Sequence, residues 1–323
     1  MVFCCKITIG NLVFNSITSV QITSSWRNFT DTCFIQIPKA VHFRENGRLK
    51  PIKSIREYIK TGDKVKVELG YNRELVTEFE GYVSRSPQPT IPVVIECEDE
   101  MWQLKRKQVS VSIPDATVKQ IVEASAPGYT INAIDEAYGD FSALKTTPAK
   151  ILEELRKTAG IYTFFRDGVL TSGKVYTDEN ITPVVANYKF GVNIIDTDLK
   201  YVDALDTKVK IYGTSVQSNG EVVRAEIGEE GGDIRREAHT EGLSQAQLKK
   251  KLERNYNLVK NFGGYEGTLT SFGFPIVRHG QTVRVVDTIY EQRDTMHLVD
   301  QVEISASPDG GYRRVLELGK EVL

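Results

Sequence analysis

Cysteine and histidine patterns typical of metal sites or disulfide frameworks are absent from this 323-residue sequence. There is no CxxC or HExxH motif, and the residues of the two types form no cluster at ligand spacing: Cys4, Cys5, Cys33, Cys97, His42, His239, His279 and His297. Zinc sites need three or four such ligands at short, defined spacings. The sequence therefore offers no ligand set for a metal or cofactor, and the cysteines are expected as reduced thiols, mostly in strands of the core.

A strong net charge and long apolar runs are also missing. The formal net charge is −2 and the isoelectric point is about 6.2, so the chain shows no basic signature of nucleic-acid binding. No apolar run is long enough to cross a bilayer, and residues 1–10 lack the basic start and cleavage site of a signal peptide. We expect a protein made in the cytoplasm, without a membrane segment or signal-peptide secretion.

Catalytic signatures are equally scarce. The sequence has no GxSxG, and GEEGGD at residues 228–233 lacks the Lys-Ser/Thr of a phosphate loop, which favours a flexible loop. DTDLK at residues 196–200 begins like a calcium loop but has Tyr201 where glycine is required and Thr207 where a bidentate glutamate is required. A strand with acidic surface residues is the better interpretation. No catalytic, cofactor-binding or metal-binding residue is therefore predicted.

Four neighbouring acids are the strongest remaining candidates for chemistry. A pair of carboxylates can act as acid and base at a glycosidic bond, and the candidates are Glu96, Glu98, Asp99 and Glu100. Lys105, Arg106 and Lys107 follow at once, which instead indicates the charge-compensated rim of a short helix. We favour the structural interpretation, so the protein is not expected to be an enzyme.

The sequence does contain a repeated strand pattern. In residues 62–107, Val65 and Val67 alternate with charged residues after Gly62, as in a half-buried strand. Gly280, Val283 and Val285 repeat the pattern at a constant offset of 218, and Gly62 to Val83 (21 residues) is matched by Gly280 to Val302 (22 residues). The pattern indicates either an internal duplication or two unrelated β meanders with similar strands.

Between the repeats the pattern changes to mixed helix and strand. Thr147 can cap a helix that begins at Pro148 and ends at Gly160, and Asp167-Gly168 predicts a hairpin turn. Asp115 is expected to cap an earlier helix. A further helix over residues 244–261 is predicted by the capping box of Ser244 and Gln247.

These patterns predict a mainly-β fold with an α+β insertion. Two similar small antiparallel β-barrels, residues 1–107 and 188–323, would flank a middle α+β domain at residues 108–187, with the helix at 244–261 inserted in the second barrel. A locally basic connection at residues 44–60 has Asn46-Gly47 as its turn and Ile52, Ile55 and Ile59 as a helical stripe. It is interpreted as a solvated link, with a docking surface for an acidic neighbour as the alternative. Its basic residues are Arg44, Arg48, Lys50, Lys53, Arg56 and Lys60.

With these elements in order, the chain resembles the baseplate or tail hub proteins of phage tails and related contractile injection systems, including late control protein D and Mu-like tail hub proteins. The resemblance spans nearly the whole chain. It rests on GDKVKVELGYN, EFEGYVSRS and IECEDEMWQLKRK, on the central TTPAKILEELRKTAGIYTFFRDGVL, and on the closing HLVDQVEISASPDGGYRRVLELG.

The resemblance implies a structural hub in the virion tail or baseplate. Such a protein would be a homotrimer whose paired modules give pseudo-sixfold symmetry, and it would join the hexameric tail tube ring to a trimeric central spike, with other baseplate proteins nearby. The family has contact surfaces and no common active site, so no site residue is carried over. Two rival functions are a cell-wall-degrading tail enzyme and a carbohydrate-binding tail module, the latter suggested by the 14 tyrosines.

Overall fold

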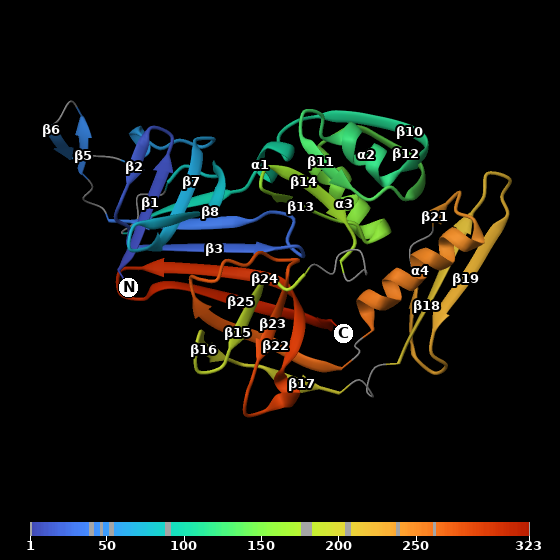
Figure 1. The fold of residues 1–323 in the computed structure, drawn as a ribbon. Helices are drawn as coiled ribbons and strands as arrows, with labels where there is room; N and C mark the ends of the chain where they lie inside the picture. The colour runs from blue at the N-terminus through green and yellow to red at the C-terminus, as the bar shows by residue number, and fades with distance from the viewer. Residues whose placement is uncertain are drawn as a thin grey trace.

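The structure, a computed structural model, describes residues 2–38, 42–45, 48–51, 55–87, 92–175, 183–203, 208–236, 240–260 and 263–322. Its elements form four groups (Figure 1). The first module consists of β1 (Phe3–Ile9), β2 (Leu12–Phe14), β3 (Ser19–Ser25), β4 (Thr32–Ile37), β7 (Lys64–Tyr71), β8 (Glu74–Val83) and β9 (Val93–Glu98). The second module consists of β15 (Ala186–Lys189), β16 (Ile194–Thr197), β17 (Lys200–Val202), β22 (Gly264–Phe272), β23 (Thr282–Val286), β24 (Thr295–Ser307) and β25 (Gly311–Val322).

The other two groups contain the helices. The middle segment comprises α1 (Met101–Leu104), β10 (Val109–Thr117), α2 (Val118–Ser125), β11 (Thr130–Ala133), β12 (Ala137–Thr146), α3 (Pro148–Ala159), β13 (Tyr162–Arg166) and β14 (Val169–Gly173). The side lobe comprises β18 (Val209–Val216), β19 (Val222–Gly228), β20 (Asp233–Arg236), β21 (Thr240–Glu241) and α4 (Gln245–Val259). Smaller elements are β5 (His42–Glu45), β6 (Arg48–Pro51) and the 3₁₀ turns η1 (Ile55–Glu57) and η4 (Glu291–Arg293).

The two modules share one sheet. Its order is β16-β22-β25-β24-β3-β4-β9-β8-β7-β1-β2, with β23 on β24 and β15 on β23. The modules join where β24 pairs with β3, from Gln301 opposite Ser25 to Ala306 opposite Val20. This order is an open path through the described strands. The mainly-β fold is confirmed, while the expected domain boundaries stay a prediction.

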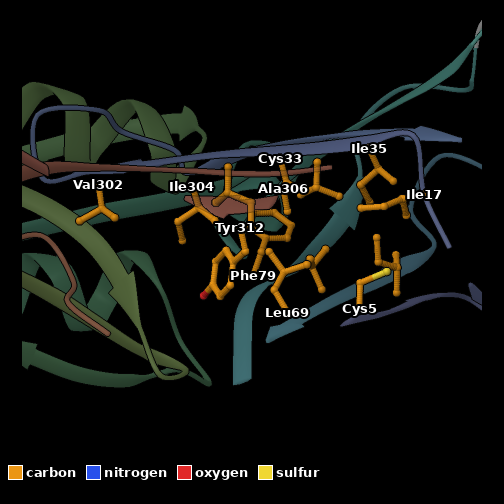
Figure 2. Close-up of a cluster of buried hydrophobic side chains, with 14 of the residues drawn as sticks. Cys5, Ile17, Cys33, Ile35, Leu69, Phe79, Val302, Ile304, Ala306 and Tyr312 are labelled. Atoms are coloured by element: carbon orange, nitrogen blue, oxygen red, sulfur yellow. The ribbon is translucent and has the colours of Figure 1, made fainter. Parts of the chain in front are cut away.

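Alternation along the strands fills a core common to both modules. Figure 2 shows Cys33, Leu69 and Ile304 in one cluster of buried side chains, contributed by β4, β7 and β24. Each large apolar side chain buried in this way contributes roughly 1.5–3 kcal/mol relative to an exposed one. The shared core therefore holds the two modules together as one body.

The middle segment has its own core, and its helix α3 has the predicted boundaries. The Thr147 hydroxyl accepts a hydrogen bond from the Lys150 N–H, Pro148 opens α3, and Gly160 closes it in the left-handed conformation at φ +63°. Asp167 and Gly168 form the predicted hairpin between β13 and β14, both at positive φ. These predictions are confirmed because each depends on local backbone chemistry.

The predicted cap at Asp115 is wrong. Residue 115 lies within β10, and the cap of α2 is Thr117, whose side chain accepts from the Gln120 N–H in a capping box. The strand extends further than expected because β10 pairs antiparallel with β12, which follows α2 and β11 in the chain, and this pairing was not predicted. The capping box of Ser244 and Gln247 at the start of α4 is confirmed.

The basic connection is only partly described. Asn46, Gly47, Ile52 and Lys53 lie outside the described residues. In place of a longer helical stripe, the described part shows the single turn η1, with Ile59 buried against the shared core. None of the helices in the described part of the chain is long and apolar enough to span a membrane.

Candidate functional site

A repeated turn marks the same point in each module. The Lys60 N–H donates to the Asp63 carboxylate at 2.8 Å, and the Arg278 N–H donates to the Gln281 side-chain oxygen at 2.8 Å. In both turns the third residue, Gly62 or Gly280, has positive φ, at +93° and +72°. Glycine adopts this conformation without the steric cost that a Cβ would impose. The turn and its capping side chain recur at the offset of 218.

The hydrogen bonds that follow also recur. Gly62 N–H donates to Val83 C=O at 2.8 Å, and Val83 N–H donates to Asp63 C=O at 2.9 Å. The matching bonds run from Gly280 N–H to Val299 C=O at 2.6 Å and from Val299 N–H to Gln281 C=O at 2.9 Å. Val83 therefore corresponds to Val299, and the sequence alignment of Val83 with Val302 is wrong because the second β hairpin has a different loop.

The pairing continues through the rest of both modules. Ile35 on β4 faces Ile95 on β9, and Leu269 on β22 faces Leu316 on β25; all four side chains are fully buried. Besides the hairpin loop, the repeat changes at its end, where β1 is antiparallel to β7 but β15 is parallel to β23. Shared turns, hydrogen bonds and core pairs favour duplication over two unrelated meanders.

The seam between the modules contains a buried ion network. Glu78 of β8 accepts from Arg314 of β25 at 2.6 Å and from Arg278 at 2.7 Å, so each carboxylate oxygen faces one guanidinium. The Glu78 and Arg314 side chains are fully buried. Arg314 also donates to the carbonyls of Gly273 and Val277 at 3.2 and 2.9 Å. Burying these charges without partners would cost several kcal/mol per ion, so the network fixes how the modules meet.

Two tyrosines extend this network. The Tyr312 hydroxyl donates to the Glu78 carboxylate, and the Tyr71 hydroxyl donates to the Tyr312 carbonyl at 2.7 Å. Burial, followed by the nearby Glu78 charge, raises the pKa of Tyr312 well above its ordinary value. Tyr312 thus stays a neutral donor, which suits a carboxylate acceptor.

A second buried acid holds the end of β3 to β24. Asp300 accepts from the Trp26 indole N–H at 2.9 Å and forms an ion pair with Arg27. Ser25 donates its hydroxyl to the Asp300 carbonyl at 3.0 Å. Trp26 then packs edge-on against Tyr162 at a ring separation of 4.6 Å, which connects the seam to the middle segment.

A cleft of about 850 Å³ lies beside the seam, between the first module, the β13–β14 turn and residues 278–279. Its wall includes Asp31 and Asp99, where burial raises the pKa of Asp31 to about 6 and that of Asp99 well above the usual range. Burial and the charges of Arg166 and Arg278 lower the pKa of His279 to about 3. Protonated Asp31 and Asp99 carboxyls and a neutral His279 imidazole are therefore favoured near pH 5.

The four candidate acids do not form a catalytic pair. Glu96 and Glu98 lie on β9, paired with Arg85 at 3.7 Å and Lys105 at 2.6 Å. Asp99 is buried and accepts from the Met101 N–H at 3.1 Å, and Glu100 accepts from the Tyr129 hydroxyl at 2.8 Å. The expected helix rim is thus corrected to a strand end followed by the short α1.

The other candidates also have structural roles where they are described. Asp198, between β16 and β17, accepts from the Thr268 hydroxyl at 3.0 Å, and residues 228–233 make the turn between β19 and β20. His297 is buried with Nδ1 3.1 Å from the Gly319 carbonyl, while His239 and Thr207 lie outside the described residues. In the described part of the chain, no three His, Cys, Asp or Glu side chains could together hold a metal ion.

The cysteines are free, as expected. Cys5, Cys33 and Cys97 are buried, and burial raises their pKa, to about 11 for Cys5. Since the thiolate is the reactive form, these thiols are inert in the folded chain.

Comparison with known proteins identifies the fold. No family model matches the sequence, and no curated protein matches it by sequence. A tail protein from Neisseria meningitidis superposes with a TM-score of 0.73 at 14% identity, over 99% of this chain and 97% of that one. This chain has the phage tail protein fold.

Two further structures agree on the tail protein fold. The 43 kDa tail protein of prophage MuSo2 from Shewanella oneidensis has a TM-score of 0.66 at 17% identity, over 98% of both chains. An E. coli type VI secretion component, described as structurally similar to T4 bacteriophage tail proteins, has a TM-score of 0.60 at 13% identity, over 98% of this chain and 79% of that one.

Sequence reasoning missed the polar seam of this tail protein fold, although one signal was present. Tyr312, Arg314, Leu316 and Leu318 alternate along β25, and all four are buried. An arginine among inward-facing positions indicates a buried charge that needs a partner. The partner could not be found the same way, because Glu78 sits at a register shift between β7 and β8.

Replacing Glu78 tests the seam. Glu78→Ala should lower the free energy of unfolding by about 3–5 kcal/mol, because it leaves buried Arg314 without its countercharge. Glu80→Ala on the same strand, where the side chain is 65% exposed and pairs with Lys66, should cost no more than about 1 kcal/mol. Urea unfolding at fixed protein concentration measures both, and equal losses would contradict the seam's role.

Replacing Asp99 tests the buried carboxyl. The folded chain holds the Asp99 proton more tightly than the unfolded chain, so wild-type stability should fall as pH rises above about 4. Asp99→Asn removes this loss while keeping an oxygen for the Met101 N–H. Melting temperatures from pH 4 to 8 should show a relative gain for the variant that grows with pH. Glu123→Gln on the exposed face of α2 is the control, and a pH-independent difference for Asp99→Asn would refute the assignment.

Proposed function

We propose that this chain is the structural hub of a phage tail or phage-like injection particle. Three copies would form a ring with pseudo-sixfold symmetry that joins the hexameric tail tube to a trimeric central spike. The observation that supports this proposal is the internal repeat: the turns at Lys60 and Arg278 and the strands after them have the same contacts. Near-complete overlap with the fold of solved tail proteins adds to it.

Symmetry explains why a hub would need two equivalent modules. A tube ring with six subunits presents six equal contacts, whereas three identical single-module chains can offer only three. Two like modules in each of three chains supply six matching faces, and a closed ring leaves no edge unpaired between subunits. The threefold arrangement of whole chains then suits a trimeric spike on the opposite side.

The proposed role is non-enzymatic. The four candidate acids of residues 96–100 are engaged in ion pairs or hydrogen bonds, or buried, and none faces another as an acid–base pair across a described substrate site. A permanent ring would bury more than roughly 2,000 Å² at each subunit interface. Its place would be the tail of the virion, with tube, spike and other baseplate proteins as partners.

The oligomeric state tests this proposal directly. The purified protein should have three times the mass of the 36.3 kDa chain at micromolar concentration, because a permanent interface of this size remains closed on dilution. Light scattering after size-exclusion chromatography measures it. A stable monomer would overturn the trimeric hub.

Cell-wall zymography tests the non-enzymatic role. The wild-type protein should produce no clearing on peptidoglycan, since Glu96, Glu98, Asp99 and Glu100 are all held in structural ion pairs or hydrogen bonds. A lysozyme lane shows that the gel reports activity. Clearing that disappears in Glu98→Ala or Glu100→Ala would instead identify a tail-associated enzyme.

A further inference from the structure

The seam inside the chain provides a template for contact between chains. This inference rests on the proposed trimeric ring. Within one chain, the contacts of the first module are made by β3, Tyr71 and Glu78. On the second module, β24 pairs with β3, and Arg278 binds Glu78. In a ring of six modules, every second seam lies between two copies. At such a seam, the second module of one copy faces the first module of the next copy. The second module must therefore make the contacts that the first module makes inside the chain.

The repeat identifies the residues in those roles. The offset of 218 places Lys60 at the position of Arg278, so a basic residue is present in both turns. The Val83 and Val299 equivalence places Asp294, which directly precedes β24, at the position of Glu78 in β8, so an acid is present at both positions. Glu78 and Arg278, which meet inside the chain, thus have counterparts of the same sign.

The residues of the internal seam differ in solvent exposure from those at the corresponding positions of the other module. Tyr71 is 9% exposed because it lies in the internal seam, whereas Ile289, on the longer loop that the second module has in place of the β7–β8 turn, is 80% exposed. Lys60 is also exposed, while the Arg278 side chain is 29% exposed and bound to Glu78. Residues that a partner covers in one seam are uncovered at the other, as expected for a surface that awaits a second copy.

The loop that carries Ile289 is held in one conformation. The Asp287 carboxylate accepts from the N–H groups of Ile289 and Tyr290 at 2.8 and 3.0 Å. Arg293 lies over the Tyr290 ring at 4.9 Å, and Arg284 forms two hydrogen bonds to Asp294 at 2.6 and 3.0 Å. Fixing an apolar loop before assembly reduces the ordering cost of binding.

A strand edge points to the same surface. The β3 counterpart in the second module is the β16–β17 pair, which among the described strands pairs only with β22. Tyr201 on β17 is 66% exposed. The Val83 and Val299 equivalence places Arg85 at the position of Gln301, where the β24–β3 pairing begins. The segment of the next copy that would lie against β16–β17 therefore begins at Arg85 and reaches Pro87, which has no N–H to donate. Side chains, more than a continued ladder, must therefore carry this contact.

We propose that Asp294, Ile289 and Tyr201 of one copy dock against the Lys60 turn of the next copy, repeating the internal seam around the ring. The contact is heterologous, because a different surface is used on each side. Rotation by one third of a circle then closes three such contacts.

Cross-linking tests the pairing. In a Cys4→Ala background, Lys60→Cys combined with Asp294→Cys and a short bismaleimide should give covalent dimers and trimers on denaturing gels. Each single cysteine variant should give none, because a heterologous seam brings unlike positions together. A protein that is trimeric by mass but gives no more product from the double variant than from the singles would overturn the seam and leave the hub intact. A monomer would overturn both.

An apolar-to-charged change provides a second measurement. Ile289→Asp should raise the concentration at which half of the protein is trimeric by about tenfold or more, because it places a charge in a contact that excludes water. Val222→Asp on the side lobe, where Val222 is 47% exposed, is the matched control and should leave assembly unchanged. Equal effects of the two changes, with both variants folded by circular dichroism, would refute the assignment.

Discussion

One carboxylate between two guanidinium groups joins the two β modules of this chain. Glu78 receives Arg314 on one oxygen and Arg278 on the other, and Tyr312 adds its hydroxyl. The groups come from opposite modules, and the Glu78 and Arg314 side chains are fully buried. A buried pair of this kind adds little net stability over an apolar contact, but breaking it is costly. Loss of one partner should therefore cost more than the intact pair contributes.

The rest of the molecule builds on that arrangement. The β24–β3 pairing carries the sheet across the seam, and Asp300 fastens the end of β3 through Trp26 and Arg27. Trp26 in turn contacts Tyr162 of the middle segment. Arg166 at the β13–β14 turn donates to the His279 carbonyl in the second module. The middle segment is thus tied to both modules at the place where they meet.

The two modules are alike in their strands and turns and differ in the loops at their edges. The turns at Gly62 and Gly280, the paired valines and the isoleucine and leucine core pairs are common to both modules, because they build the sheet. The differences lie at the rim. The first module closes β7 and β8 with the tight turn Asn72-Arg73, whereas the second carries the longer loop with η4 and exposed Ile289. Equivalent sheets with different loops would suit the proposed ring, in which alternate seams lie within and between chains.

The sequence by itself determined the mainly-β character, the helices of the middle segment and the repeat. Glycine at positive φ, a capping threonine and alternating valines each act over a few residues, so their structural effect can be read locally. Only the tertiary structure decided that Asp99 lies buried rather than on a helix rim, that Val83 matches Val299, and that Glu78 meets Arg314 across 236 positions of the chain. Those outcomes depend on a strand bulge, a loop length and the pairing of distant edges, and none of these is set by the residues adjacent in sequence.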